Sequence, residues 1–438
     1  MNDKLSEYTI PEISPELERG SQWLKEKRYA FRKSFNRMPL PRRGLHLWRY
    51  TDPHEFIFEH EKAADTAFHE DYDEFEQQAK KQLEESHLDA LVIEHGGRDI
   101  RLFGTDQIAS RGIIVSTLSE AFKNHYELVE SHLYRLINNE TGKFEALNST
   151  LWNDGILIFV PDNQTLEKPI HLLRMAGRAN SNQHHRLLVI AGKNSELTLI
   201  DEYGGGADDE NQDISLVNSA VEIFGGENSR LRYVSLQRQA RNSKIYLTHR
   251  ARAEKDAKMY TIPLIFGAAL SKQNFGVVLN DQGAESHITG LLFGTGYQQF
   301  DNHTLHHHAS SQSFSNIDFK VVLRDKARSA YTGLIRIENE ARACEAYQEN
   351  RNLLLNQGAR AESIPELEIL NEDVQCSHGA TVGPIDPMMI FFLKSRGISE
   401  SEAVRMVVTG FVEATLNQLP DDIKERLRTF VTRRLEDI

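Results

Sequence analysis

The chain has 438 residues, and its 64 acidic against 51 basic side chains give a formal net charge of -13 at pH 7. This length allows two or three structural units with a large buried core, while the acidic balance argues against nucleic acid or anionic membranes as partners. The N-terminus lacks the apolar core of a secretory signal, and no run reaches the roughly 18 apolar residues of a membrane span. Two cysteines, Cys344 and Cys376, do not make a disulfide framework, so we expect a soluble cytoplasmic protein.

Residues 1–150 are expected to form a mostly helical N-terminal region. Ser14 and Pro15 are typical of a helix cap followed by proline in the first turn. The amphipathic stretch after them continues to about Arg37. Residues 73–85 and 118–136 also suit helices.

The sequence pattern of residues 151–385 predicts a core built of β-strands. Short apolar runs such as 156–160, 187–190 and 197–200 alternate with small polar turns, which is typical of strands. Small residues recur in these turns with spacings of 34, 28, 27, 43 and 32, the markers being Ser195, Ser229, Ala257, Ala284, Ala327 and Ala359. A period near roughly 30 residues favours stacked coils, a β-solenoid, because stacked turns leave little room for side chains. An ordinary β-sandwich with frequent turns is the alternative that this periodicity leaves open.

Residues 386–438 return to helical patterns. A short helix is expected from Asp386 to Ser395, closed by Gly397. Ser399 and Glu402 form a capping box for a second helix that Pro420 ends, and a third helix follows. Such apolar stripes are more often core than interface, and a docking surface is the second interpretation.

Cys376 and His378 lie two residues apart in a segment of small, turn-forming residues, 371–383. Alternate residues of a strand share one face, so both groups could reach the same atom. Thiols and imidazoles are both ligands of transition metals. The competing interpretation is a buried small thiol at Cys376 and a surface imidazole at His378.

A second group of imidazoles follows Asp301. Strand geometry predicts that His306 and His308 share one face, and histidine-rich tracts can bind transition metals. We therefore include His303, His306 and His308 as candidate metal ligands, with structural roles inside a solenoid as the alternative. No nucleotide-binding motif accompanies them, since Leu187 occupies the position of the P-loop glycine before Gly192.

Several motifs resemble one known family. Residues 376–383 (CSHGATVG), followed by 391–398 (FFLKSRGI), are similar to the signature of SufB and SufD, the scaffold proteins of the SUF system that assemble iron–sulfur clusters. Residues 348–355 (QENRNLLL), 365–369 (PELEI) and 48–52 (WRYTD) resemble further motifs in the family's order. The dense part of the resemblance covers residues 300–415, and the N-terminal motif extends it across most of the chain.

The resemblance favours the D-type member. Residues 48–52 match a D-type motif, and B-type members carry a cysteine in the stretch that corresponds to residues 350–354, where this chain has none. At residues 341–346 the chain departs from the family pattern, with Cys344 in place of a common threonine. We interpret Cys344 as a small buried residue. The family's usual pair of aspartates reads Glu372 and Asp373 here, preceded by Asn371.

The resemblance implies a right-handed parallel β-helix core, in agreement with the turn spacing. It also implies a non-catalytic scaffold subunit that binds no nucleotide, with a SufB-type subunit and a SufC-type ATPase as partners, the ATPase docking on the C-terminal helices. A transient iron–sulfur cluster or iron would lie between the two scaffold subunits, with His378 as a ligand and Cys376 as a weaker candidate. Since few thiolates remain in this chain, a partner is expected to supply the others. A homodimer stays open.

Two other functions are compatible with a solenoid. A parallel β-helix enzyme acting on acidic polysaccharide would carry carboxylates and basic residues along one groove, and the acidic balance argues against it. A purely structural homodimer is the third possibility, and it predicts no iron in any purified complex.

Overall fold

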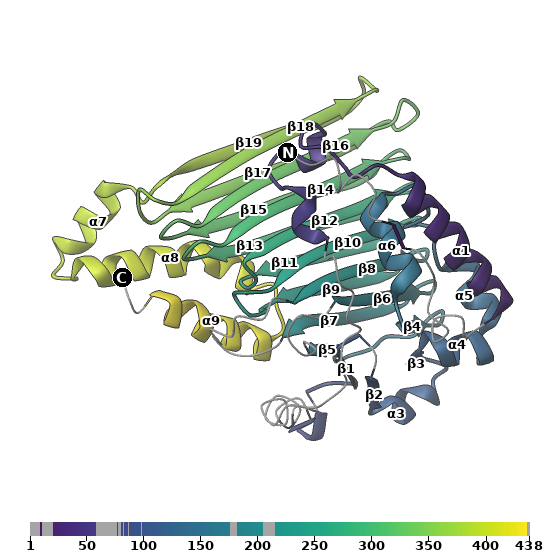
Figure 1. The fold of residues 1–438 in the computed structure, drawn as a ribbon. Coiled ribbons are helices and arrows are strands. Elements are labelled where there is room, and N and C mark those ends of the chain that lie inside the picture. Colours follow the sequence, from purple (N-terminus) through teal and green to yellow (C-terminus); the bar gives the residue numbers. More distant parts are fainter. Residues whose placement is uncertain are drawn as a thin grey trace.

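Short apolar runs in the centre of the chain form strands whose inward side chains stack from coil to coil. The computed structural model describes residues 9–10, 21–57, 77, 80–81, 83–85, 87–97, 99–175, 182–204 and 215–435. Within them, two sheets face each other across one apolar core (Figure 1). The predicted mainly β fold with a β-solenoid is confirmed.

Each coil places one strand in each sheet, and neighbouring coils pair in parallel register. The nine-stranded sheet contains β3 (Ile114–Thr117), β4 (Ile156–Val160), β6 (Asn182–Ala191), β8 (Leu216–Gly225), β10 (Lys244–Ala253), β12 (Leu270–Leu279), β14 (Gln299–His308), β16 (Arg328–Ile337) and β18 (Arg360–Ile369). The ten-stranded sheet contains β1 (Ala90–His95), β2 (Asp99–Phe103), β5 (Ile170–Met175), β7 (Glu196–Gly204), β9 (Arg230–Gln237), β11 (Lys258–Ile265), β13 (Glu285–Gly294), β15 (Phe314–Leu323), β17 (Cys344–Leu354) and β19 (Val374–Pro384). Of the strands that the structure describes, only β2 and β3 pair antiparallel with their neighbours.

The turns at one corner of the solenoid repeat the same backbone conformation. Asn194, Asn228 and Asp256 have φ values of 54°, 53° and 55°, a left-handed region that Asn and Asp tolerate better than most residues. The amide of Asn228 donates to Asn194 Oδ1, and the amide of Asn194 donates to Asn163 Oδ1, at 2.9 and 2.8 Å. Stacked asparagines therefore hold successive coils together at this corner.

One of the turn spacings derived from the sequence, 43 residues between Ala284 and Ala327, mixes two corners. Ala284 precedes β13 in the ten-stranded sheet, whereas Ala327 precedes β16 in the nine-stranded sheet. The next turn at the corner of Ala284 ends at Ser313, before β15, which is 29 residues further on (313 − 284). When the markers of each corner are counted separately, the number of residues per coil is therefore more regular than the spacings read from the sequence.

The N-terminal region combines helices with three strands, β1, β2 and β3, that were not expected from the sequence. Helix α1 (Gln22–Arg37) begins after Ser21, whose hydroxyl accepts a hydrogen bond from the Leu24 N–H, and ends near the predicted residue. The predicted cap at Ser14 and most of the helix predicted for 73–85 lie outside the described residues. The other helices described in this region are η2 (His46–Trp48), η3 (Pro53–Phe56), α3 (Thr105–Ala109), α4 (Leu118–Asn124), α5 (Tyr126–His132) and α6 (Lys143–Leu151).

Residues 46–56, here called the strap, cross the outer face of the nine-stranded sheet (Figure 1). Trp48 stacks on Tyr246 of β10 with ring centroids 5.7 Å apart. The Thr51 hydroxyl donates to Asp301 of β14 at 2.6 Å. The WRYTD motif thus fastens the N-terminal region to the solenoid.

The C-terminal segment forms three described helices, of which the last two cover the outer face of the opposite, ten-stranded sheet. The three are α7 (Pro387–Lys394), α8 (Glu400–Leu416) and α9 (Asp421–Leu435). The Ser399 half of the predicted capping box is confirmed, because the Ser399 hydroxyl accepts from the Glu402 N–H at 3.3 Å, whereas the Glu402 carboxylate pairs with Arg405. Helix α8 ends at Leu416 rather than at Pro420, and its apolar side chains share a core with those of α9 and of strands β7, β9, β11, β13 and β15. Among the described residues, no helix combines the length and apolarity that crossing a bilayer requires.

Candidate functional site

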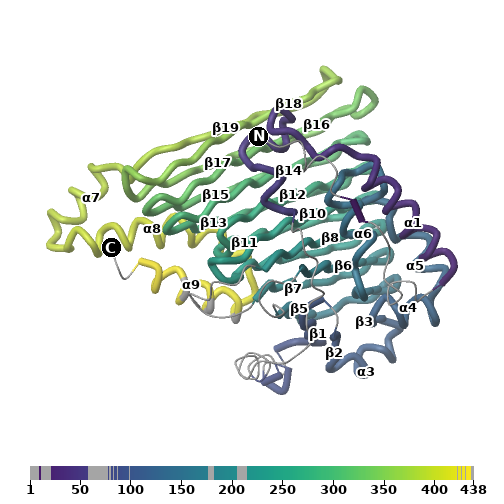
Figure 2. The backbone as a smooth tube through the Cα atoms, in the orientation of Figure 1, coloured from purple at the N-terminus to yellow at the C-terminus, as the bar shows by residue number. Residues whose placement is uncertain are grey.

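Cys376 and His378 lie on β19, the last strand of the ten-stranded sheet. The parallel register places Cys376 beside Ala346 and His378 beside Gln348 of β17. As alternate strand residues they share one face, and that face continues the solenoid interior because Ala346 and Gln348 are buried. No described strand follows β18 or β19 in either sheet, so this end of the solenoid is open (Figure 2).

The two candidate ligands differ in accessibility. His378 is exposed, whereas Cys376 is partly buried against Cys344 and Ala346. Burial raises the pKa of the Cys376 thiol, and the neighbouring Cys344 raises it further. A raised thiol pKa lowers the fraction of thiolate, which is the metal-binding form. The imidazole of His378 is therefore the more accessible group of the pair.

Cys344 is a small buried residue, as interpreted from the sequence. It is fully buried, and its Sγ lies 3.3 Å from the Ser313 hydroxyl and 3.5 Å from the Ser310 carbonyl. Cys344 lies on β17, one coil before β19, and its side chain packs in the same small apolar cluster as Cys376.

Sequence reasoning missed a polar ladder on β17 beneath His378. Asn350 donates to the Phe319 carbonyl at 2.9 Å, and Asn352 donates to Asn350 Oδ1 at 2.7 Å. Gln348 is 3% exposed, yet neither its side-chain nitrogen nor its oxygen has a partner among the described residues. The alternating polar residues of QENRN were the available signal. The side-chain amide of Gln348, the residue beside His378, is therefore unpaired among the described residues at the open end.

The histidines of β14 are divided between the two faces of that strand. His306 and His308 point into the solenoid, where His306 contacts Ser286 at 2.9 Å and His308 bridges Ser313 and Ser315 at 2.7 and 2.8 Å. His303 faces outward and pairs with Asp301 at 2.8 Å. The three rings therefore do not converge. Nowhere in the described part of the chain do three His, Cys, Asp or Glu side chains gather as a metal site.

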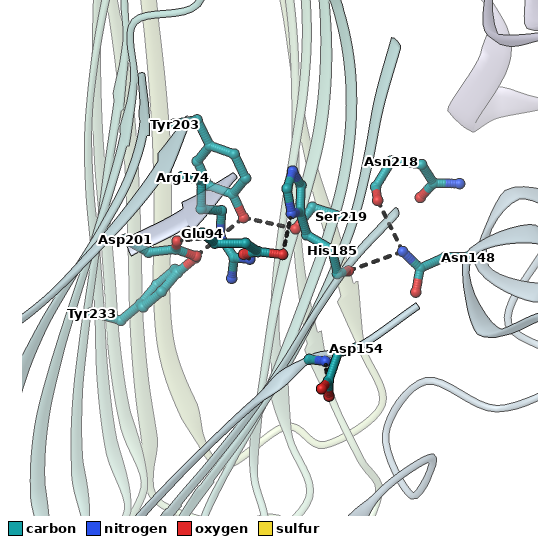
Figure 3. A network of polar contacts seen from close by, with 11 residues as sticks. Glu94, Asn148, Asp154, Arg174, His185, Asp201, Tyr203, Asn218, Ser219 and Tyr233 are labelled. Atoms are coloured by element: carbon teal, nitrogen blue, oxygen red, sulfur yellow. Dashed lines mark hydrogen bonds and ion pairs between the residues drawn. The ribbon is translucent and has the colours of Figure 1, made fainter. Parts of the chain in front are cut away.

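An ionic network that the sequence did not reveal fills the interior of the first coils (Figure 3). Arg174 pairs with Glu94 and, through Nε, with Asp201 Oδ1 at 2.7 Å. His185 Nδ1 lies 2.7 Å from Glu94, and the hydroxyls of two tyrosines donate to Asp201. The side chains of Arg174, Glu94 and Asp201 are at most 1% exposed. This buried network orders the end of the solenoid opposite to His378.

The C-terminal helices present an apolar surface. None of the residues of α7 is buried, and Phe391 and Phe392 are 65% and 55% exposed. Met388, Met389 and Phe392 line a hollow that Val407 of α8 completes. An exposed apolar patch of this kind is typical of a protein interaction site.

Comparison with known proteins points to one family for both parts of the chain. Residues 173–411 match the family model for the SufBD core domain of SUF-system FeS cluster assembly, and residues 16–172 match the SufBD protein N-terminal region. Proteins described as "Iron-sulfur cluster assembly SufBD family protein" are similar over nearly the whole chain. One from Staphylococcus epidermidis is 24% identical, and one from Staphylococcus saprophyticus 25%, each across 99% of this chain and 93% of the relative. The core-domain match alone covers more than half of the sequence, and the chain therefore belongs to the SufBD family of iron–sulfur cluster assembly proteins.

Proposed function

We propose that this chain is a D-type scaffold subunit that holds a nascent iron–sulfur cluster jointly with a B-type subunit and docks an ATPase through its C-terminal helices. The observation that carries the proposal is the exposed imidazole of His378 at the open end of the solenoid, above the partly buried Cys376. The cluster is cargo, which the subunits build and pass on.

The cysteine count supports a shared site. The chain has only Cys344 and Cys376, and Cys344 is fully buried. Iron–sulfur clusters are usually held by four ligands that are mostly thiolates. One partly buried thiol and one imidazole fall short of that number, so a second subunit must complete the set. The absence of a cysteine at residues 350–354 of β17 supports the D-type assignment.

The shape of this end supports a subunit interface. Among the described residues, β18 and β19 are the edge strands of the two sheets, and such edges invite pairing with another chain. Val382 and Ile369 are 48% and 38% exposed there. A B-type solenoid placed against this end would bury these side chains and bring its own ligands to His378.

The ten-stranded sheet would link an ATPase docked on the C-terminal helices to the end of the solenoid that carries His378. Helices α8 and α9 share their core with strands β7, β9, β11, β13 and β15, and Arg434 of α9 donates to the carbonyls of Phe293 and Phe266 at 3.0 and 2.8 Å. This sheet ends in β19. We infer that an ATPase closing on α7 and α8 would move the strand that carries His378.

Replacing His378 with alanine is expected to reduce the iron and acid-labile sulfide of the co-expressed complex several-fold, because an accessible ligand is lost. Cys376→Ala should have a smaller effect, since its thiol has a raised pKa. The measurement is iron and sulfide per complex after anaerobic purification with the B-type subunit and the ATPase. His125→Ala, at an exposed histidine between α4 and α5, is the control. Wild-type cluster content in the His378→Ala complex would contradict the assigned role.

Replacing both Phe391 and Phe392 with aspartate should abolish capture of the ATPase. Burying one phenylalanine contributes about 1.5–3 kcal/mol, so losing both corresponds to on the order of a hundredfold or more in affinity. Both rings are already exposed, so the free energy of unfolding should change little. Tyr297→Asp, at a tyrosine that is 80% exposed on the β13–β14 turn, is the matched control. Equal ATPase binding by both variants, measured by calorimetry, would place the docking surface elsewhere.

Family membership favours this scaffold role over an enzyme that acts on acidic polysaccharide. A screen of the purified chain on uronate polymers tests the alternative directly. Bond cleavage above a heat-treated control would support it, whereas no cleavage is expected of a scaffold.

A further inference from the structure

A cavity of about 340 Å³ lies between the strap and the outer face of the nine-stranded sheet, over strands β10, β12, β14 and β16. Its position is at the opposite face of the solenoid from the C-terminal helices, and it does not include Cys376 or His378. This volume is in the range of pockets that bind small organic molecules. One wall is apolar, formed by Trp48, Phe144 and Leu334.

The charged groups of the lining are mostly matched within the chain. Lys272 Nζ lies 2.9 Å from Asp301, and His46 of the strap pairs with Glu366 of β18 at 3.0 Å. Glu145 Oε1 accepts from the hydroxyls of Tyr246 and Thr248, both at 2.7 Å. Lys143 donates to the carbonyls of Phe35 and Met38.

Unlike these groups, Arg250 of the lining has no charged partner among the described residues. Its Nη1 donates to the carbonyls of His249 and Asn274 at 2.9 and 3.1 Å, but no carboxylate among the described residues forms an ion pair with the guanidinium. Glu145 acts on it electrostatically without forming a pair. A guanidinium offers five donors in a planar fork, so Nε and Nη2 remain to bind an oxyanion in two-point geometry.

Two further polar atoms of the lining lack a partner among the described residues. Asn274 is 7% exposed and its Oδ1 is unpaired, and His303 is 6% exposed and its Nδ1 is unpaired. Buried polar atoms of this kind normally have hydrogen-bond partners. An acceptor such as Asn274 Oδ1 is satisfied by a hydroxyl or amino group, which a bound molecule can supply.

We propose that this cavity binds a small organic anion, with a carboxylate or phosphate on the Arg250 guanidinium and an apolar body against Trp48 and Phe144. A hydroxyl or amino group on that body would meet Asn274. Because the strap forms one wall, the bound molecule would also hold residues 46–56 against the solenoid. The site is separate from the proposed cluster site and does not depend on it.

The test uses the full chain and three probes of similar shape: 6-hydroxy-2-naphthoate, 1-naphthyl phosphate and the neutral 6-hydroxy-2-naphthalenemethanol. We expect saturable binding of at least one anionic probe by calorimetry, and weaker binding of the neutral one. The better of the two anions identifies the recognised group. Arg250→Gln should weaken anion binding about tenfold or more, since it removes a charge-assisted pair.

Arg252→Gln is the matched control, because Arg252 lies on the same face of β10, pairs with Glu254 and does not line the cavity. Leu334→Trp is the second variant; it fills the cavity without changing its charge and should abolish binding. The proposal is overturned if neither anion binds saturably at millimolar concentration. It is equally overturned if the anions bind Leu334→Trp as well as the wild type, or bind Arg250→Gln and Arg252→Gln alike.

Discussion

Replacing Arg174 with methionine is expected to lower the free energy of unfolding by about 3–5 kcal/mol, the usual cost of removing one partner from a buried ion pair. Arg174 is the cation between Glu94 and Asp201, and all three side chains are at most 1% exposed (Figure 3). Methionine fills similar space but leaves both carboxylates in the interior. Urea unfolding at neutral pH measures the change. The control is Arg351→Met, whose pair with Glu349 is about half exposed and should contribute less than about 1 kcal/mol.

The loss caused by Arg174→Met should also depend on pH. Burial alone would raise the pKa of Glu94, but the charges of His185 and Arg174 and their hydrogen bonds together lower it. In the wild type, this lowered pKa stabilises the fold above the carboxyl's ordinary pKa, and the contribution is lost as the pH falls. In the variant, Arg174 no longer lowers the pKa of Glu94, so burial raises this pKa. Glu94 then takes up a proton at a higher pH, and its unpaired negative charge is removed.

The difference between wild type and Arg174→Met should therefore shrink when unfolding is measured at about pH 4.5 instead of pH 7. A difference that stays constant between the two pH values would show that lost packing, rather than stranded charge, destabilises the variant.

The stacked architecture could be predicted because it depends on local chemistry. Ser195, Ser229, Ala257 and Ala284 precede successive strands of one sheet, and each is at most 1% exposed, so small residues recur wherever coils stack. The same reasoning could not separate the two corners, since small turn residues occur at both. The strands β1 to β3 were missed because they are short and lie among helices.

The candidate site could be predicted only in part. The spacing of Cys376 and His378 correctly indicated one strand face, but only the coil order shows that β19 is the last strand and that His378 is exposed. For the histidines of β14, strand alternation correctly paired His306 with His308. It could not show that this face is the interior, where serines bond one ring nitrogen of His306 and both ring nitrogens of His308. Contacts between distant segments, such as Thr51 with Asp301, carry no local signal.

Glu222 of β8 illustrates how such distant contacts hold the N-terminal region in place. Its carboxylate accepts hydrogen bonds from the backbone N–H groups of Tyr134, Leu136 and Ile137, at 3.0, 2.8 and 3.1 Å. It also pairs with Arg186, and both side chains are fully buried. The turn it holds contains Tyr134 at φ 66°, a strained conformation for a bulky residue.

Replacing Glu222 with glutamine should lower the free energy of unfolding by about 3–5 kcal/mol, because the buried Arg186 loses its counter-charge and an amide NH2 group faces a backbone donor. The effect should be local at first. Hydrogen exchange in α1 and α6 is expected to accelerate before exchange in β12 to β16 changes, since the carboxylate joins the helical layer to the sheet. Glu227→Gln is the matched control, because Glu227 follows the same strand in an exposed pair with Lys193. If exchange accelerates equally in the helices and in the distant coils, the N-terminal layer and the solenoid unfold as one unit, and Glu222 stabilises both rather than the joint between them.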